Sequence, residues 1–221
     1  QQAVVNGVRR LVFVSSIGVH GTHTNNRAPF RHDDQPAPIE PYAISKLEAE
    51  RELTNVANKT GLEIVIVRPP LVYGPGVGAN FLRLMRLVDR GWPLPFGAIQ
   101  GLRSLVALDN LVDLLVRCTK TPAASGEVFL VSDGQDISLP DLIRMLARHL
   151  GRAARLLPLP RTALLAVAGL LGEGATIERL TSELRVDMGH TCRTLAWQPP
   201  ISTEAGIAAT ARWYRTGGCA S

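Results

Sequence analysis

Two short apolar runs with a helix-like segment between them constrain the fold of this chain more than any other feature. The first run lies in "RRLVFVSSIGVHG", from Leu11 to Val14, and the second in "LEIVIVRPP", residues 62–70. Apolar runs of this length are typical of strands buried on both faces of a parallel sheet. The segment between them begins as a helix near Pro41 and ends at Gly61, because glycine permits the left-handed stop. Strand, helix and strand in this order predict an α/β protein with a parallel crossover.

The rest of the chain adds further elements to this unit. Apolar periodicity predicts three more helices and "EVFLVSD" predicts another strand, which begins at Glu127. From Gly151 onward the pattern is helical and rich in loops, without another clear strand. The three expected helices cover residues 80–90, 109–119 and 139–150.

The first residues read as the end of a helix that runs directly into a buried strand. In "QQAVVNGVRRLVFV" the helix stops at Asn6 and Gly7. The later "GPGVG", residues 74–78, follows a strand but lacks the G-x-G-x-x-G spacing of a dinucleotide-binding turn. We therefore expect the chain to be the C-terminal part of a longer protein whose earlier part carries that turn.

Composition narrows the class of protein. With 46% hydrophobic and 19% charged residues, 221 residues can bury the core of one domain, or of one domain with a smaller lobe. The net charge of +5 comes from arginines spread from Arg9 to Arg215, whereas a nucleic-acid partner favours a concentrated basic stripe. The apolar "TALLAVAGLLGEG" is too short to span a bilayer. We expect no nucleic-acid partner and no membrane partner.

The cysteines and histidines give no sign of a disulfide scaffold or a metal site. Three cysteines make no even set, and neither they nor the five histidines have ligand spacing. A cytoplasmic location with reduced thiols fits this pattern best. The residues concerned are Cys118, Cys192, Cys219, His20, His23, His32, His149 and His190.

The stretch "PIEPYAISKLEAE" places Tyr42 and Lys46 four residues apart on the expected helix. Positions i and i+4 share one helix face, so the ammonium can lie near the phenol. A phenol is a poor base at neutral pH unless a neighbouring cation favours the phenolate. Such a tyrosine can take a proton from a hydroxyl while hydride leaves the same carbon. Ser16, at the end of the preceding strand, stands where sites form in parallel sheets.

Three linked motifs now carry a family resemblance. "VFVSSIGVHG", "PYAISKLEAE" and "VRPPLVYGPG", in this order, resemble the extended short-chain dehydrogenase/reductase superfamily and its NAD-dependent nucleotide-sugar epimerase/dehydratase branch, of the UDP-glucose 4-epimerase type. "RSLVALDNLVDLL" and "LAWQPPISTEAGI" are similar to later segments of the same family. The resemblance implies a partial Rossmann-type parallel sheet flanked by helices, with a small, mostly helical substrate-binding lobe.

The resemblance also implies how the chain divides. Residues 1–75 would be the C-terminal part of the NAD-binding domain. Residues 76–221 would form the substrate-binding lobe, interleaved with Rossmann elements that return at about 104–135.

Site residues follow by position in the motifs. Ser16, Tyr42 and Lys46 would be catalytic, with Ser16 orienting the reacting hydroxyl and Tyr42 acting as acid and base. Lys46 would also bind the nicotinamide ribose. The implied cofactor-binding residues are Ser15, Tyr42, Lys46, Pro69 and Pro70, and the implied substrate-binding residues are Ser16, Asn80, Phe81, Leu94, Phe96, Arg103 and Arg179.

Some positions depart from the family pattern. His20 stands where the family usually has Tyr in "VYG", and Leu71 stands where many members have Asn. Dehydratases of this branch have an acidic pair directly after the catalytic Ser or Thr, but Ile17 and Gly18 occupy those places. Dehydration is therefore disfavoured.

The resemblance favours epimerisation of a UDP-hexose at C4 through a 4-keto intermediate, with tightly held NAD. The alternatives are an NAD(P)H-dependent reductase of the same superfamily, for which NADP is not excluded, or an inactive chain that binds only a nucleotide sugar. The longer enzyme is expected to be a homodimer.

Each residue assignment also has a simpler structural alternative. Tyr42 and Lys46 can lie on a solvated helix face, and Ser16 can close the strand with a local backbone hydrogen bond. Arg103 can be an ordinary surface arginine. Asn80 can be the N-cap of the helix that follows it.

Overall fold

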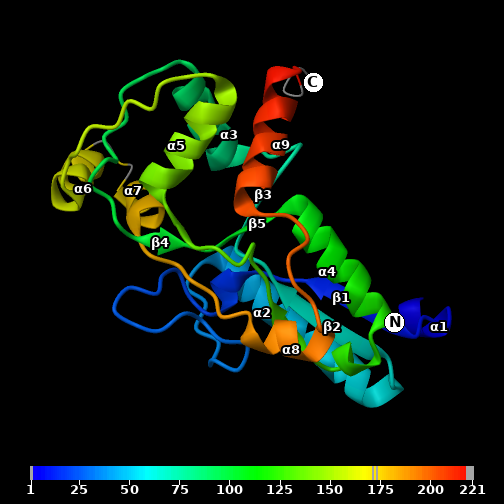
Figure 1. Cartoon of the computed structure of the whole chain (residues 1–221). Coiled ribbons are helices and arrows are strands. Elements are labelled where there is room, and N and C mark those ends of the chain that lie inside the picture. The colour runs from blue at the N-terminus through cyan, green and yellow to red at the C-terminus, as the bar shows by residue number, and fades with distance from the viewer. Residues whose placement is uncertain (1, 171, 173, 218–221) are drawn as a thin grey trace.

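A parallel three-stranded sheet forms the base of the molecule (Figure 1). The structure, a computed structural model, describes residues 2–170, 172 and 174–217. The strands are β1 (Arg10–Val14), β2 (Glu63–Arg68) and β6 (Val128–Leu130), in the order β1-β2-β6. All pairs are parallel, which confirms the expected class of fold.

The crossover from β1 to β2 runs through α2 (Pro41–Thr60). Proline fits the first turn of a helix because its missing N–H has no intrahelical acceptor there. Gly61 ends the helix with φ 72°, a conformation that glycine adopts without steric cost. Both ends of this helix lie where the sequence predicts them. The strand it leads into is central and buried, as its apolar run predicts.

The other expected helices also form, each within one residue of its predicted limits. The N-terminal helix, α1 (Gln2–Val5), ends before Asn6 and Gly7, as expected. The three internal helices are α3 (Ala79–Asp89), α4 (Leu108–Lys120) and α5 (Leu139–Leu150).

The sequence does not predict four very short strands. β3 (Leu71–Tyr73) pairs in parallel with β5 (Leu105–Ala107), and β4 (Leu102–Arg103) pairs antiparallel with β7 (Ile137–Ser138). Two or three residues are too few to show a period of two, so only tertiary pairing defines these strands. They link the sheet to the helices above it.

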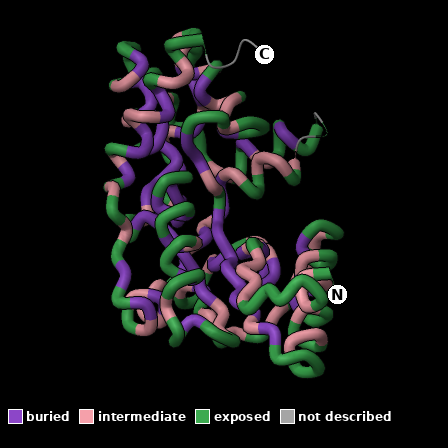
Figure 2. The backbone as a smooth tube through the Cα atoms, turned by 90° about the vertical axis from the view of Figure 1, so that its right-hand side faces the viewer, coloured by how far each residue is buried: buried purple, intermediate pink, exposed green. Residues whose placement is uncertain are grey.

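Those helices form a second packed region at the top of Figure 1. α3 and α5 pack with α9 (Thr203–Arg215) around one apolar cluster, and α6 (Arg161–Leu170) packs against α7 (Gly174–Thr181). In Figure 2, buried segments run through this region and through the sheet below it. The remaining helical elements are η1 (Ile17–Val19), η2 (Pro122–Ala124) and α8 (Gly189–Leu195), and the last of these returns to β6. The division near residue 75 stays a prediction.

Gly206 lets α9 approach the short strands closely, so Gly206→Ala is expected to destabilise the protein. A Cβ at this position would lie 2.7 Å from the Tyr73 hydroxyl and 3.0 Å from the Ala107 Cβ. Overpacking of this kind costs about 1–3 kcal/mol of unfolding free energy, measurable by urea denaturation. Gly169→Ala is the control, because no atom of the described residues lies within 4 Å of its Cβ position in α6. Equal effects of the two substitutions would contradict the close-packing argument.

Within the described ranges, no helix combines the length and the apolar character that a membrane span requires. Cys118 is a buried free thiol and Cys192 is also free, whereas Cys219 lies outside the described residues. The same part of the chain brings together no group of three or more His, Cys, Asp or Glu side chains that could hold a metal ion.

Candidate active site

A cleft of about 390 Å³ opens at the carboxyl ends of β1 and β2. The strands end side by side there, since the Ser15 N–H donates to the Val67 carbonyl at 2.7 Å and the Ile17 N–H to the Pro69 carbonyl at 2.9 Å. Clefts at this edge of a parallel sheet are where α/β proteins bind ligands. Seven of the predicted site residues line it: Ser15, Ser16, Tyr42, Pro69, Pro70, Arg103 and Arg179.

The two serines differ in their hydrogen bonding. The Ser16 hydroxyl accepts a hydrogen bond from the Gly18 N–H at 3.1 Å and so caps η1. Ser16 therefore makes a local backbone hydrogen bond, which is the simpler structural alternative that the sequence allows. This bond uses the hydroxyl oxygen only as an acceptor, so the hydroxyl proton can still be donated. The Ser15 hydroxyl is buried and has no hydrogen-bond partner among the described residues. A buried polar group without a partner is costly and suggests a ligand contact.

Helix α2 presents Tyr42 to the cleft, with 60% of the residue exposed. The Lys46 ammonium donates to the Val14 carbonyl at 2.9 Å. Its nitrogen lies 5.7 Å from the centroid of the Tyr42 ring and 4.8 Å from that of Phe13. Lys46 is thus fixed between the helix and the end of β1, and is not extended into solvent. The catalytic roles of these residues stay predictions.

Arg103, on β4, and Arg179, on α7, also line the cleft, although neither belongs to the three-stranded sheet. Arg103 donates to the carbonyls of Arg179 at 2.6 Å and Ser182 at 2.7 Å. Burial, and then the charge of Arg179, lowers the pKa of Arg103 to about 10, so it remains a cation at neutral pH. Its two hydrogen bonds to main-chain carbonyls hold the Arg103 side chain at the cleft. Arg179 forms an ion pair with Glu40, the residue that precedes α2.

The other predicted substrate residues lie outside this cleft. Asn80 and Phe96 line a smaller, mostly apolar pocket of about 170 Å³, which also includes Arg83. Phe81 and Leu94 are buried in the apolar cluster of the upper region. Asn80 is not the N-cap of α3, because Gly78 occupies that position.

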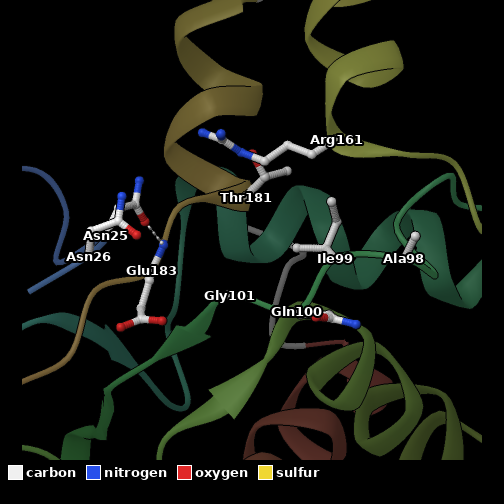
Figure 3. Close-up of a pocket in the computed structure, with 9 residues that line it drawn as sticks. All are labelled: Asn25, Asn26, Ala98, Ile99, Gln100, Gly101, Arg161, Thr181 and Glu183. Atoms are coloured by element: carbon white, nitrogen blue, oxygen red, sulfur yellow. Dashed lines mark hydrogen bonds between the residues drawn. The ribbon is translucent and has the colours of Figure 1, made fainter.

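A third pocket, of about 390 Å³, contains none of the residues that the sequence singled out (Figure 3). Arg161, at the start of α6, donates to the Thr181 hydroxyl at 3.1 Å. Across the pocket the Asn25 side-chain oxygen accepts from the Glu183 N–H at 2.9 Å. These polar groups are thus paired within the protein.

The sequence reasoning missed three buried side chains beneath the cleft, namely His20, Glu50 and Arg68. Their polar groups bond to one another, and each residue is at most 5% exposed. One signal was available, because Glu50 follows Lys46 by four residues and therefore shares its helix face. For His20 the sequence shows a departure from a motif and the lack of metal-ligand spacing, and neither indicates a contact with Arg68.

The fold and the cleft together define a Rossmann-type α/β protein with a serine at the carboxyl end of β1 and a tyrosine and a lysine on helix α2 beside it. The model of the NAD dependent epimerase/dehydratase family matches residues 2–132, more than half of the chain. The chain therefore belongs to that family.

Curated relatives and solved structures agree with this assignment. A UDP-glucose 4-epimerase of Vibrio cholerae is 46% identical over 97% of this chain and 66% of its own length. One from Mycolicibacterium smegmatis is 29% identical over 97% of this chain and 65% of its own length.

Among solved structures, UDP-glucuronic acid 4-epimerase from Bacillus cereus in complex with NAD superposes with a TM-score of 0.77 at 22% identity, over 97% of this chain and 64% of the other. UDP-glucose 4-epimerase from Thermotoga maritima with UDP-glucose gives 0.74 at 23% identity, over 97% and 66%. At these identities the structures establish the fold alone. The chain spans less than two thirds of the length of each of these four proteins.

Proposed function

We propose that the protein interconverts the C4 epimers of a UDP-hexose, with NAD as the hydride carrier. The observation that carries this proposal is the meeting of Ser16, Tyr42, Arg103 and Arg179 in one cleft, although they come from separate parts of the chain. The 46% identity to a UDP-glucose 4-epimerase supports the same reaction and the same nucleotide.

The residues of the cleft fit the nicotinamide end of NAD. Ser15 contributes a buried hydroxyl without a partner among the described residues, and Pro69 and Pro70 contribute main-chain groups at the end of β2. Lys46, held at the end of β1, can bind the ribose hydroxyls. When held there, NAD would supply the acceptor and the donor of the C4 hydride of the sugar.

The chain's own residues handle the proton and the substrate. Ser16 donates a hydrogen bond to the sugar O4 and orients it. Tyr42, as the phenolate, takes the O4 proton as the C4 hydride leaves, which yields a 4-keto sugar. After the sugar turns, Tyr42 returns the proton to O4 as hydride reaches the other face of C4. Arg103 and Arg179 bind the diphosphate as charge-assisted donors. Arg179 leaves its ion pair with Glu40 to do so.

The remaining substrate contacts belong to the same proposal. Asn80 and Phe96 would contact the nucleotide from the smaller apolar pocket, where Arg83 adds a cation. Phe81 and Leu94, which are buried, would support that pocket from behind. We expect a homodimer because of the family resemblance, and a cytoplasmic location because Cys118 and Cys192 are free thiols. We expect no nucleic-acid partner because the positive charge is dispersed along the chain.

The test is interconversion of UDP-glucose and UDP-galactose with NAD at substoichiometric concentration and no reduced cofactor. The expected result is many turnovers per NAD, because the hydride returns in each cycle, and the same final ratio from either substrate, measured by chromatography, because the reaction is reversible. A requirement for one equivalent of NADH or NADPH per turnover would instead identify a reductase. Sugar-nucleotide binding without turnover under either condition would identify an inactive protein.

A further inference from the structure

Three buried polar side chains lie beneath the candidate active site and bond to one another. The Arg68 guanidinium donates to both carboxylate oxygens of Glu50, at 3.0 and 2.6 Å, and its Nη1 lies 2.8 Å from His20 Nε2. The three residues are 3–5% exposed. A bidentate, buried arginine–carboxylate pair has a fixed geometry, unlike an exposed pair.

This network joins the three elements that carry the candidate catalytic groups. Glu50 follows Lys46 by four residues and Tyr42 by eight, on one face of α2. Arg68 is the last residue of β2 and directly precedes Pro69 in the cleft. His20 ends the η1 turn that Ser16 begins. One guanidinium therefore contacts a residue from each of the other two elements.

The contact with Arg68 defines the state of His20. A guanidinium only donates hydrogen bonds, so Nε2 must accept and the imidazole must be neutral with its proton on Nδ1. Nδ1 is itself buried and has no hydrogen-bond partner among the described residues. Burial, and then the charge of Arg68, lowers the pKa of His20 to about 4, and Arg27 acts in the same direction. Asp34 and Glu50 act against them, and the Phe30 ring stacks on the imidazole at 5.4 Å. His20 is thus a neutral acceptor at neutral pH.

We propose that His20, Arg68 and Glu50 are positioning residues for the reaction, which together fix α2 and the η1 turn so that Tyr42 and Ser16 converge on one substrate oxygen and Lys46 stays beside Tyr42. The inference rests on the proposed function and goes beyond it, because none of the three residues lines the cleft. Catalysis depends steeply on such placement, since a shift of about 1 Å can cost about a hundredfold in rate.

The first test compares Glu50→Gln with Glu48→Gln. Glu48 is exposed, two residues away on the same helix, so its substitution is the matched control. We expect Glu50→Gln to lower kcat by about tenfold with KM within about twofold, at a temperature where the variant is fully folded. Glu48→Gln should retain wild-type kcat. A variant Glu50→Gln that loses only thermal stability, with kcat unchanged, would overturn the proposal.

The second test asks whether His20 acts as an acceptor. Glutamine offers an amide oxygen to Arg68, whereas leucine of similar size offers none, so His20→Gln should retain about half of the kcat or more and His20→Leu should lose about tenfold. Nitrogen NMR of the wild type should find the His20 proton on Nδ1 at pH 7. Equal kcat in the two variants, or a proton on Nε2, would count against the proposal.

The NMR measurement also separates this inference from the proposed function. If the wild-type protein converts no UDP-sugar, the proposed function fails, yet the backbone amide signals of Tyr42 and Ser16 should still shift in Glu50→Gln and not in Glu48→Gln. If the wild type is active but these signals and kcat do not respond, the positioning role alone fails.

Discussion

Tyr42→Phe is expected to lower kcat by about 100- to 10,000-fold, with little change in KM. The substitution removes one hydroxyl and leaves the ring of a residue that is 60% exposed at the cleft. In the proposed reaction that hydroxyl takes the O4 proton and returns it, and general acid–base groups contribute rate factors of this size. An interaction made only in the transition state affects kcat and leaves substrate binding nearly unchanged. Steady-state kinetics with a UDP-hexose would measure the effect.

The control for this variant is Tyr214→Phe, which also removes a phenol hydroxyl. Tyr214 lies on α9 and packs against the apolar cluster of the upper region, and it does not line the cleft. Its kcat should stay within about twofold of the wild type, since a substitution outside the site does not change the reacting groups. Tyr42→Phe should retain the wild-type unfolding temperature. A Tyr42→Phe enzyme with more than a tenth of wild-type kcat would refute the acid–base role.

Much of the fold can be predicted from the sequence, because in several elements the local backbone preferences favour the same structure as the tertiary packing. Pro41 and Gly61 define the ends of α2 by their own backbone preferences, and the apolar run of β2 is long enough to identify a buried strand. β3 and β5 have only three residues each, so the pairing partner, and not the local pattern, decides that they are strands.

The same distinction between local sequence and tertiary contacts applies to the side chains of the site. Ser16 and Tyr42 were predictable because each stands at the end of an element whose direction the sequence reveals. Leu94, by contrast, forms an isolated bridge with Leu156, a pairing between distant segments that places it in the core and away from the cleft. Which loop residues face a ligand depends on such contacts, and no local pattern encodes them.

The buried network shows why resemblance alone overlooks positioning groups. Sequence spacing relates Glu50 to Lys46 within one helix, but the contacts of Arg68 with Glu50 and His20 join residues 18 and 48 positions apart. A motif comparison records His20 only as a replaced tyrosine. The hydrogen bonds give that residue a chemical requirement, namely a neutral acceptor opposite a guanidinium.

Arg68→Leu is expected to destabilise the protein by about 3–5 kcal/mol. The side chains of Arg68 and Glu50 are 6% and 4% exposed, so removal of the cation leaves a carboxylate buried without its partner. The substitution also removes the donor that faces His20 Nε2. Urea denaturation monitored by circular dichroism would measure the loss as a lower midpoint.

The double variant Glu50→Leu/Arg68→Leu tests whether the cost comes from the unpaired charge. Two apolar side chains in place of a buried pair are often tolerated, so we expect the double variant to lose at least about 2 kcal/mol less than the sum of the single losses. The exposed pair Arg144–Asp141 is the control, and Arg144→Leu should cost no more than about 1 kcal/mol. Additive losses at Glu50 and Arg68 would mean that the two side chains stabilise the protein independently, and that the ion pair does not couple α2 to β2.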